Sequence, residues 1–120
     1  MTAEYASNGV RRYCLALDLK DDPALIERYR EFHQPENVWP EVKQSIKDSG
    51  ILDMKIYLLG NRLVMVMEVD NEFSFAAKAA ADQSNAKVRE WEQLMDTFQQ
   101  AVPWAKAGEK WVPMEPIFSL

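Results

Sequence analysis

A strand passes directly into a helix over residues 11–33, whose sequence is RRYCLALDLKDDPALIERYREFH. From Arg11 to Lys20 apolar and polar side chains alternate, as they do in a half-buried β-strand. Its apolar face would carry Tyr13, Leu15, Leu17 and Leu19. Asp22 then precedes a proline, the pattern of a helix N-cap followed by proline at the first helical position. The stretch therefore predicts a strand over residues 11–20 and a helix that starts at Pro23.

Two prolines and a glycine delimit the next helices. Pro35 disfavours helical geometry in the residue before it and so ends the first helix. Pro40 opens a second helix, and Gly50 supplies its C-terminal stop. The alanine-rich residues 72–81 predict a short third helix, and an apolar stripe over residues 84–99 predicts a longer fourth one.

Three further strands complete the expected sheet. Residues 52–58 and 63–69 alternate in polarity on either side of Gly60-Asn61, so they predict an antiparallel hairpin. The apolar faces of its two strands would carry Leu52, Met54, Ile56 and Leu58, and Leu63, Met65, Met67 and Val69. The tail at residues 109–118 contains prolines, which suit an edge strand better than a central one.

The predicted order of elements is strand, helices, strand, strand, helices, strand. This order indicates an α+β, ferredoxin-like fold, in which an antiparallel sheet carries helices on one face. The opposite face, or its vicinity, would hold Tyr57, Val64, Val66 and Trp111, mixed with Asp18, Lys55 and Glu68. A homodimer packed sheet to sheet, in a dimeric α/β-barrel type assembly, would cover that face. We expect residues 1–9 to form a flexible arm and residues 10–120 a single domain.

Composition limits the partners and the compartment. The 120 residues carry a net charge of −5, which argues against binding to nucleic acid or to an anionic membrane surface. A small neutral ligand is compatible with this charge. Cys14 is a lone cysteine and so forms no internal disulfide, and residues 1–8 lack the apolar core of a signal peptide. We therefore expect a cytoplasmic protein that binds neither nucleic acid nor membrane.

Several common site motifs are missing. One histidine and one cysteine far apart give no zinc-ligand spacing, so no metal site of this kind is expected. Sites for magnesium or calcium built from carboxylates alone stay open. The four glycines are scattered and form no phosphate-binding loop, and the chain has no Gly-x-Ser-x-Gly elbow.

The densest group of reactive and aromatic side chains is YREFHQPENVWPE, residues 29–41. Tyr29 and His33 are four residues apart, so they lie above one another on the apolar face of the first helix. Histidine is the usual proton-transfer residue near neutral pH. From these residues alone, His33 is either a proton shuttle or a hydrogen-bonded core histidine. Trp39 either lines a pocket or packs against the second helix, and Trp91 lies on a helical stripe, where packing is the ordinary role.

The tyrosine, the histidine and the Trp-Pro-Glu triplet at residues 39–41 resemble the L-rhamnose mutarotase family. The resemblance extends over residues 11–118 and includes the Ile-Tyr-Leu strand segment at residues 56–58. It implies a dimer of ferredoxin-like subunits that equilibrates the α and β anomers of a 6-deoxy sugar without a cofactor. The catalytic histidine of the family falls on His33, its sugar-contacting tyrosine on Tyr29, and the first of its paired tryptophans on Trp91.

Three departures from the family pattern bear on the substrate. The segment between the histidine and Trp-Pro-Glu is two residues longer than is common, which places Glu36 and Asn37 at the pocket rim. A second family tyrosine appears as Met54, and the second paired tryptophan appears as Glu92. Because a carboxylate can accept a hydrogen bond from a sugar hydroxyl, Glu92 makes L-fucose a rival of L-rhamnose as the substrate.

The expected chemistry is general acid/base catalysis, by which one well-placed residue can accelerate a reaction ~100- to 10,000-fold. His33 would protonate the ring oxygen and take the proton back on closure. Tyr29 would orient the sugar, and Trp91 would pack against its apolar face. Water, Glu92 and Glu36 are all candidates for the group that deprotonates the anomeric hydroxyl.

Two other functions suit the same architecture. Dimeric ferredoxin-like domains include small monooxygenases that work without a cofactor or degrade haem, and a lone histidine with aromatic neighbours would serve them too. A ligand-binding module without catalytic activity is the third possibility.

Overall fold

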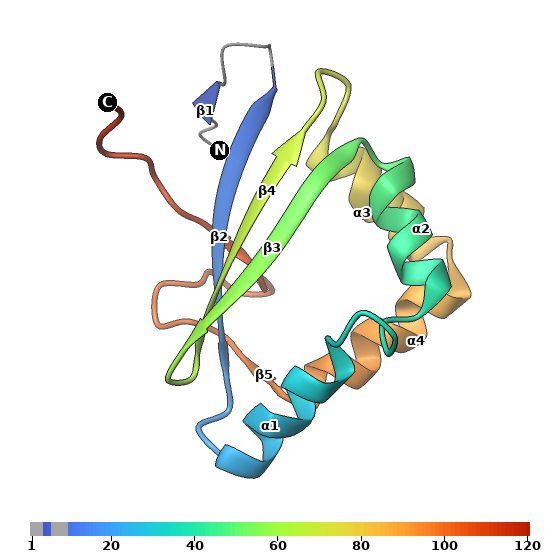
Figure 1. The fold of residues 1–120 in the computed structure, drawn as a ribbon, viewed down its shortest axis with the longest axis vertical. Helices are drawn as coiled ribbons and strands as arrows, with labels where there is room; N and C mark the ends of the chain where they lie inside the picture. The colour runs from blue at the N-terminus through green and yellow to red at the C-terminus, as the bar shows by residue number, and fades with distance from the viewer. Residues whose placement is uncertain (1–3, 6–9) are drawn as a thin grey trace.

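The computed structural model describes residues 4–5 and 10–120, which form one antiparallel sheet with helices against one face (Figure 1). In chain order the elements are β1 (Glu4–Tyr5), β2 (Arg11–Leu19), α1 (Pro23–Phe32), α2 (Pro40–Asp48), β3 (Ile51–Leu59), β4 (Arg62–Val69), α3 (Phe75–Gln83), α4 (Ala86–Asp96), β5 (Gln99–Gln100) and β6 (Val112–Pro113). The expectation of a flexible arm falls on residues outside this description, apart from β1, which pairs with β2.

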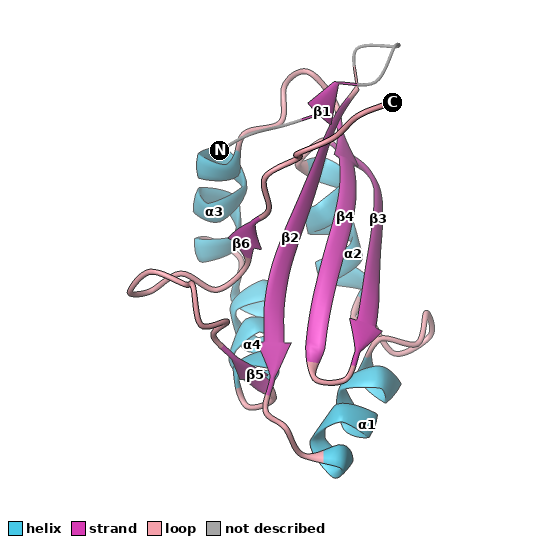
Figure 2. Ribbon diagram, turned by 90° about the vertical axis from the view of Figure 1, so that its left-hand side faces the viewer, coloured by secondary structure: helices cyan, strands magenta, loops and turns pink. Residues whose placement is uncertain are grey.

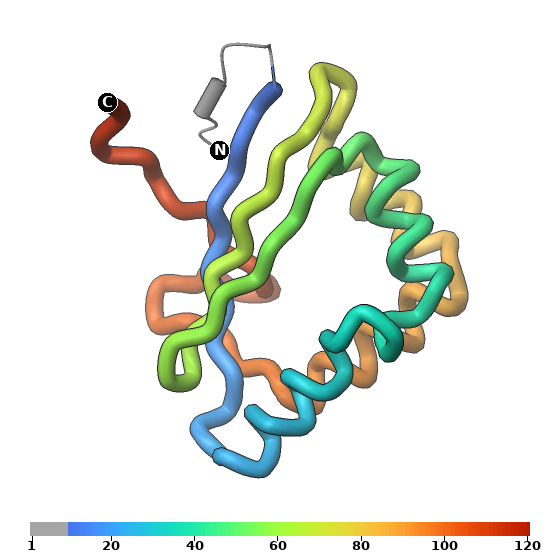
Figure 3. Tube along the Cα trace, viewed as in Figure 1, coloured from blue at the N-terminus to red at the C-terminus, as the bar shows by residue number. Residues whose placement is uncertain are grey.

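The sheet has the predicted ferredoxin-like arrangement. β4 lies between β2 and β3 and pairs antiparallel with both (Figure 2). The other edge of β2 pairs in turn with the short strands β1, β6 and β5. The chain after β6 continues away from the helices, on the far side of β2 (Figure 3). The tail thus provides the predicted edge strand, although only Val112 and Pro113 pair with β2.

Side-chain caps start α1, α3 and α4, of which α1 begins at the predicted Pro23, whereas α3 and α4 begin at Phe75 and Ala86, later than the predicted residues 72 and 84. Asp22 Oδ1 accepts hydrogen bonds from the backbone N–H groups of Ala24 at 2.9 Å and Leu25 at 3.3 Å. Ser74 and Asn85 cap α3 and α4 in the same way, each accepting from an N–H three residues on. These bonds satisfy N–H groups that have no partner inside the helix.

The core lies between the sheet and the helices. The predicted apolar face of β2 is buried throughout, with Leu19 and Leu17 at 0% and 1% exposure. From the helices, Tyr29, Val42, Trp91 and Met95 join this core. An enclosed site can therefore form only on the face of the sheet that the helices cover.

Three details differ from the predictions. Leu52 does not share the apolar face of β3, because a bulge between Ile51 and Asp53 shifts the register and leaves it 59% exposed. Trp111 packs against the core on the helical side rather than the opposite face. The fourth helix is shorter than expected, since α4 ends at Asp96 and Gln99 belongs to β5.

No helix in residues 4–5 and 10–120 is long and apolar enough to cross a membrane.

Candidate active site

A cavity of about 660 Å³ lies between the sheet and the helices. This volume is within the ~300–1,000 Å³ typical of small-molecule sites. Five of the six predicted site residues line it, namely His33, Tyr29, Trp91, Glu92 and Met54. Trp39 is not among the lining residues, and its ring instead contacts that of Trp91, with the centroids 5.3 Å apart. Glu36 is exposed and also lies outside the lining.

His33 caps the C-terminal end of α1, where Tyr29 holds it in two ways. The Nδ1 atom lies 2.7 Å from the backbone carbonyl oxygen of Tyr29. The imidazole and phenol rings also face each other, with centroids 4.2 Å apart and planes 30° apart. A carbonyl oxygen only accepts hydrogen bonds, so Nδ1 carries the proton and Nε2 is left with a free lone pair.

The surroundings favour the neutral form of both rings. Burial lowers the pKa of His33 below its usual 6.5, against an opposing effect of the hydrogen bond to Tyr29. Burial likewise raises the pKa of the Tyr29 phenol above 10.0, against an opposing effect of the bond from Gln99. At neutral pH the site therefore holds a proton acceptor, the imidazole, beside a phenol that retains its proton.

Gln99 is a site residue that sequence reasoning missed. Its Nε2 group donates to the Tyr29 hydroxyl at 3.2 Å, and the residue lines the cavity. The predicted fourth helix included this position, whereas the pairing of β5 with β2 at Leu19 brings it next to α1. Because the phenol oxygen accepts from Gln99, its own proton stays available for a ligand.

Trp91 forms the aromatic wall of the cavity. Its ring lies edge-on to His33, with centroids 5.7 Å apart, and edge-on to Phe32 at 6.2 Å. Trp91 is only 7% exposed, and contacts with the rings of Phe32, His33 and Trp39 hold it in place. Such a face suits the apolar C–H surface of a sugar ring.

A second part of the lining is charged. It consists of Lys78, Asp82, Glu92 and Lys110. Burial raises the pKa of Glu92, and the charge of Asp82 adds to this effect, whereas Lys110 and Lys78 oppose it. Lys78 and Asp82 on α3 and Lys110 in the loop before β6 carry no signal in the sequence, because charged residues are ordinarily solvent-facing.

The described residues include no group of three or more His, Cys, Asp or Glu side chains placed to hold a metal ion.

Known proteins are similar to this chain over nearly its whole length. The sequence profile of the L-rhamnose mutarotase family matches residues 12–120. The L-fucose mutarotase of Xanthomonas campestris pv. campestris is 45% identical over 111 residues, which cover 92% of this chain and 89% of that protein. A UPF0734 protein of Dictyostelium discoideum is 38% identical over 114 residues, covering 92% and 90%.

The fold is likewise shared with a solved structure. The L-rhamnose mutarotase of Formosa agariphila superimposes with a TM-score of 0.65 and 23% identity, covering 91% of this chain and 97% of that one. This likeness confirms the predicted ferredoxin-like fold. The family profile and the 45% identical relative extend over nearly the whole chain, and the chain therefore belongs to the L-rhamnose mutarotase family.

Proposed function

We propose that the protein is a sugar mutarotase, an isomerase that interconverts the α and β anomers of a 6-deoxy-L-hexose, with L-fucose as its first substrate and L-rhamnose as the second. The proposed chemistry rests on the contact between His33 Nδ1 and the Tyr29 carbonyl, which leaves Nε2 of His33 as the basic nitrogen. His33 lines the cavity. Family membership favours this function over the monooxygenase and the binding module.

His33 moves one proton between two oxygens of the sugar. Nε2 removes the proton from the anomeric hydroxyl, the C1–O5 bond breaks with its electron pair on the ring oxygen, and the imidazolium returns the proton there. Rotation about C1–C2 in the open aldehyde and the reverse steps give the other anomer. O1 and O5 share one carbon, so a single imidazole serves both. This order starts from the base, unlike the acid-first order expected from the sequence, because the resting imidazole is neutral.

The other lining residues position the sugar in this proposal. The Tyr29 hydroxyl donates to a sugar oxygen while Gln99 holds it from the other side. Trp91 packs against the apolar face of the ring. These roles add binding and orientation rather than a second catalytic group.

Saturation-transfer NMR of anomer exchange tests the proposal directly. Wild-type protein should exchange the anomers of L-fucose faster than buffer alone, and His33→Ala and His33→Asn should lose this acceleration while they keep the circular dichroism spectrum of the wild type. Wild-type exchange at the buffer rate with both sugars would refute the function. Full activity in both variants would refute the role of His33.

The preference for L-fucose rests on Glu92 and on the relative. Glu92 lines the cavity where the family pattern has a tryptophan, and its carboxylate can accept from a hydroxyl. The 45% identical relative is named L-fucose mutarotase. Equal kcat/KM values for both sugars would contradict this preference.

We also propose a homodimer that covers the face of the sheet opposite the helices. Tyr57 is 57% exposed on this face, and it pairs with Val64, which lies opposite it on β4. Exposed aromatic and aliphatic side chains on one sheet face are typical of a subunit interface. Sedimentation equilibrium should give twice the mass of one chain, and Tyr57→Glu should shift it toward the monomer. A wild-type monomer at micromolar concentration would refute the dimer.

The cytoplasm is the compartment we propose, since the lone Cys14 gives the chain no disulfide to form in an oxidising environment. Fractionation of cells that express the chain with a C-terminal epitope tag tests this location.

A further inference from the structure

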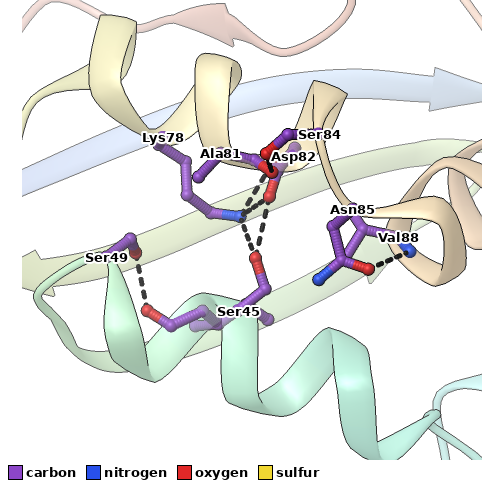
Figure 4. A network of polar contacts seen from close by, with 9 residues as sticks. Ser45, Ser49, Lys78, Ala81, Asp82, Ser84, Asn85 and Val88 are labelled. Carbon is purple, nitrogen blue, oxygen red and sulfur yellow. Dashed lines mark hydrogen bonds and ion pairs between the residues drawn. The ribbon is translucent and has the colours of Figure 1, made fainter.

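An ion pair on α3 joins the wall of the cavity. The Nζ atom of Lys78 lies 2.7 Å from both Oδ atoms of Asp82, one helical turn along (Figure 4). From α2, the Ser45 hydroxyl donates to Asp82 Oδ1 at 2.8 Å and accepts from Lys78 Nζ at 3.3 Å. The side chains of Lys78 and Asp82 are only 19% and 15% exposed. This pair is therefore fixed in position and largely withdrawn from water.

The pair borders the same cavity as the catalytic histidine but lies on another helix. His33 follows α1 and Lys78 lies on α3, and these helices occupy opposite ends of the sheet (Figures 1 and 2). His33, Lys78 and Asp82 nevertheless all line one cavity. A sugar bound in this cavity with C1 at His33 can therefore place its other edge at α3.

The geometry of a pyranose says which edge this is. C4 lies across the ring from C1, and C3 lies across from O5. When the O1–C1–O5 edge is at His33, the hydroxyls at C3 and C4 point to the charged part of the lining. L-Fucose and L-rhamnose have the same arrangement at C3 and opposite arrangements at C4, so the residue that contacts O4 can discriminate between them.

Asp82 retains room for a ligand. A carboxylate has about four acceptor positions, and three contacts are present in the structure, two from Lys78 and one from Ser45. A further hydroxyl donor can bind without displacing any of them. Hydrogen bonds to charged groups are stronger than those between neutral groups, particularly away from water.

We propose that Asp82 is a specificity-determining residue that accepts a hydrogen bond from the hydroxyl at C4 of the sugar, with Lys78 and Ser45 as its positioning residues. This assignment rests on the proposed mutarotase function and names how its site recognises the end of the sugar remote from the reaction.

The Lys78–Asp82 pair also links α3 to α2 through Ser45. The test must therefore distinguish a loss of sugar recognition from a loss of stability. The double variant Lys78→Met, Asp82→Leu removes both charges and leaves no buried charge without a partner. A matched control replaces an ion pair outside the cavity, Glu27→Leu with Arg30→Met on α1, whose side chains are 62% and 63% exposed. Thermal unfolding verifies that both variants are folded.

The measurement is kcat and KM for anomer exchange with L-fucose and with L-fucose analogues that lack the hydroxyl at C3 or at C4. We expect the Lys78–Asp82 variant to lose about 10- to 100-fold in kcat/KM with L-fucose, the size of a charged hydrogen bond, and to match the wild type on the C4-deoxy analogue. The control variant should match the wild type with every sugar.

Each outcome decides a different point. Equal losses with L-fucose and the C4-deoxy analogue, or no loss with L-fucose, would overturn the role of Asp82 while exchange by the wild type leaves the proposed function standing. A loss that disappears only with the C3-deoxy analogue would overturn the assignment to C4. Absence of exchange by the wild type with L-fucose and L-rhamnose would overturn both proposals.

Discussion

The backbone carbonyl of Tyr29 lies 2.7 Å from Nδ1 of His33, four residues along the chain. The contact uses the last turn of α1, where carbonyl groups have no partner inside the helix. It fixes the tautomer of His33 through the backbone, so substitution of the Tyr29 side chain leaves the hydrogen bond in place. In the proposed mechanism the backbone of Tyr29 therefore fixes the tautomer of His33, whereas the side chain of Tyr29 contacts the sugar.

The pH dependence of exchange follows from this arrangement. Since burial lowers the pKa of His33 below 6.5, we expect kcat/KM to fall at acidic pH with a midpoint below 6.5, as the base becomes protonated. Rates of anomer exchange against pH, corrected for buffer catalysis, measure this profile. A midpoint above 6.5 would contradict a desolvated imidazole.

The lowered pKa of His33 also makes the stability of the fold depend on pH. Below pH 6.5 the unfolded chain binds a proton at His33 before the folded chain does, so the free energy of unfolding should decrease as pH falls through this value. Urea unfolding at pH 7.5 and pH 5.5 measures the decrease. His33→Phe, which cannot titrate, should show a smaller decrease, and an identical one would contradict the burial of a neutral imidazole.

Tyr29→Phe separates the two functions of Tyr29. The variant keeps the carbonyl bond to His33 and loses the hydroxyl that Gln99 orients. We expect a loss of about 10-fold in kcat/KM, the size of one hydrogen bond, with an unchanged pH midpoint. Gln99→Leu is the companion variant and should lose less, because the phenol is retained. A shifted midpoint in Tyr29→Phe would show that the hydroxyl acts on the imidazole.

Glu92→Trp should move the sugar preference. Replacing the carboxylate removes a hydroxyl acceptor from the lining and restores the tryptophan of the family pattern. We expect the ratio of kcat/KM for L-fucose over L-rhamnose to fall about 10-fold. Competition between the two sugars in one NMR sample gives this ratio. An unchanged ratio would exclude Glu92 from discrimination.

Gly50→Ala should destabilise the fold. Gly50 has φ +93°, and a Cβ there would lie 2.6 Å from Asp70 Oδ1. We expect a loss of about 1–3 kcal/mol in the free energy of unfolding, from backbone strain and from the displaced carboxylate. Gly60→Ala is the matched control, because Gly60 also has a positive φ, +60°, but nothing within 4 Å of its Cβ position. An equal loss in both variants would show that the contact with Asp70 has no effect on the free energy of unfolding.

Local patterns in the sequence determined most of the fold. The alternation in residues 11–20 predicted β2, Asp22 and Pro23 predicted the start of α1, and Gly60-Asn61 predicted the hairpin of β3 and β4. Each signal acts between residues a few positions apart, through side-chain alternation or hydrogen bonds within one turn. The order of the predicted elements indicated the fold, and the resemblance to the family implied the roles of His33, Tyr29 and Trp91.

Only the tertiary structure decided how distant segments meet. Gln99 reaches Tyr29 across 70 positions, because β5 pairs with the end of β2. Ser45 and Asp82, 37 positions apart, meet where α2 packs near α3. The bulge that exposes Leu52 depends on the pairing of β3 with β4. A sequence pattern repeats with the period of one helix or strand, whereas these contacts depend on how whole elements pack, and no local period encodes that packing.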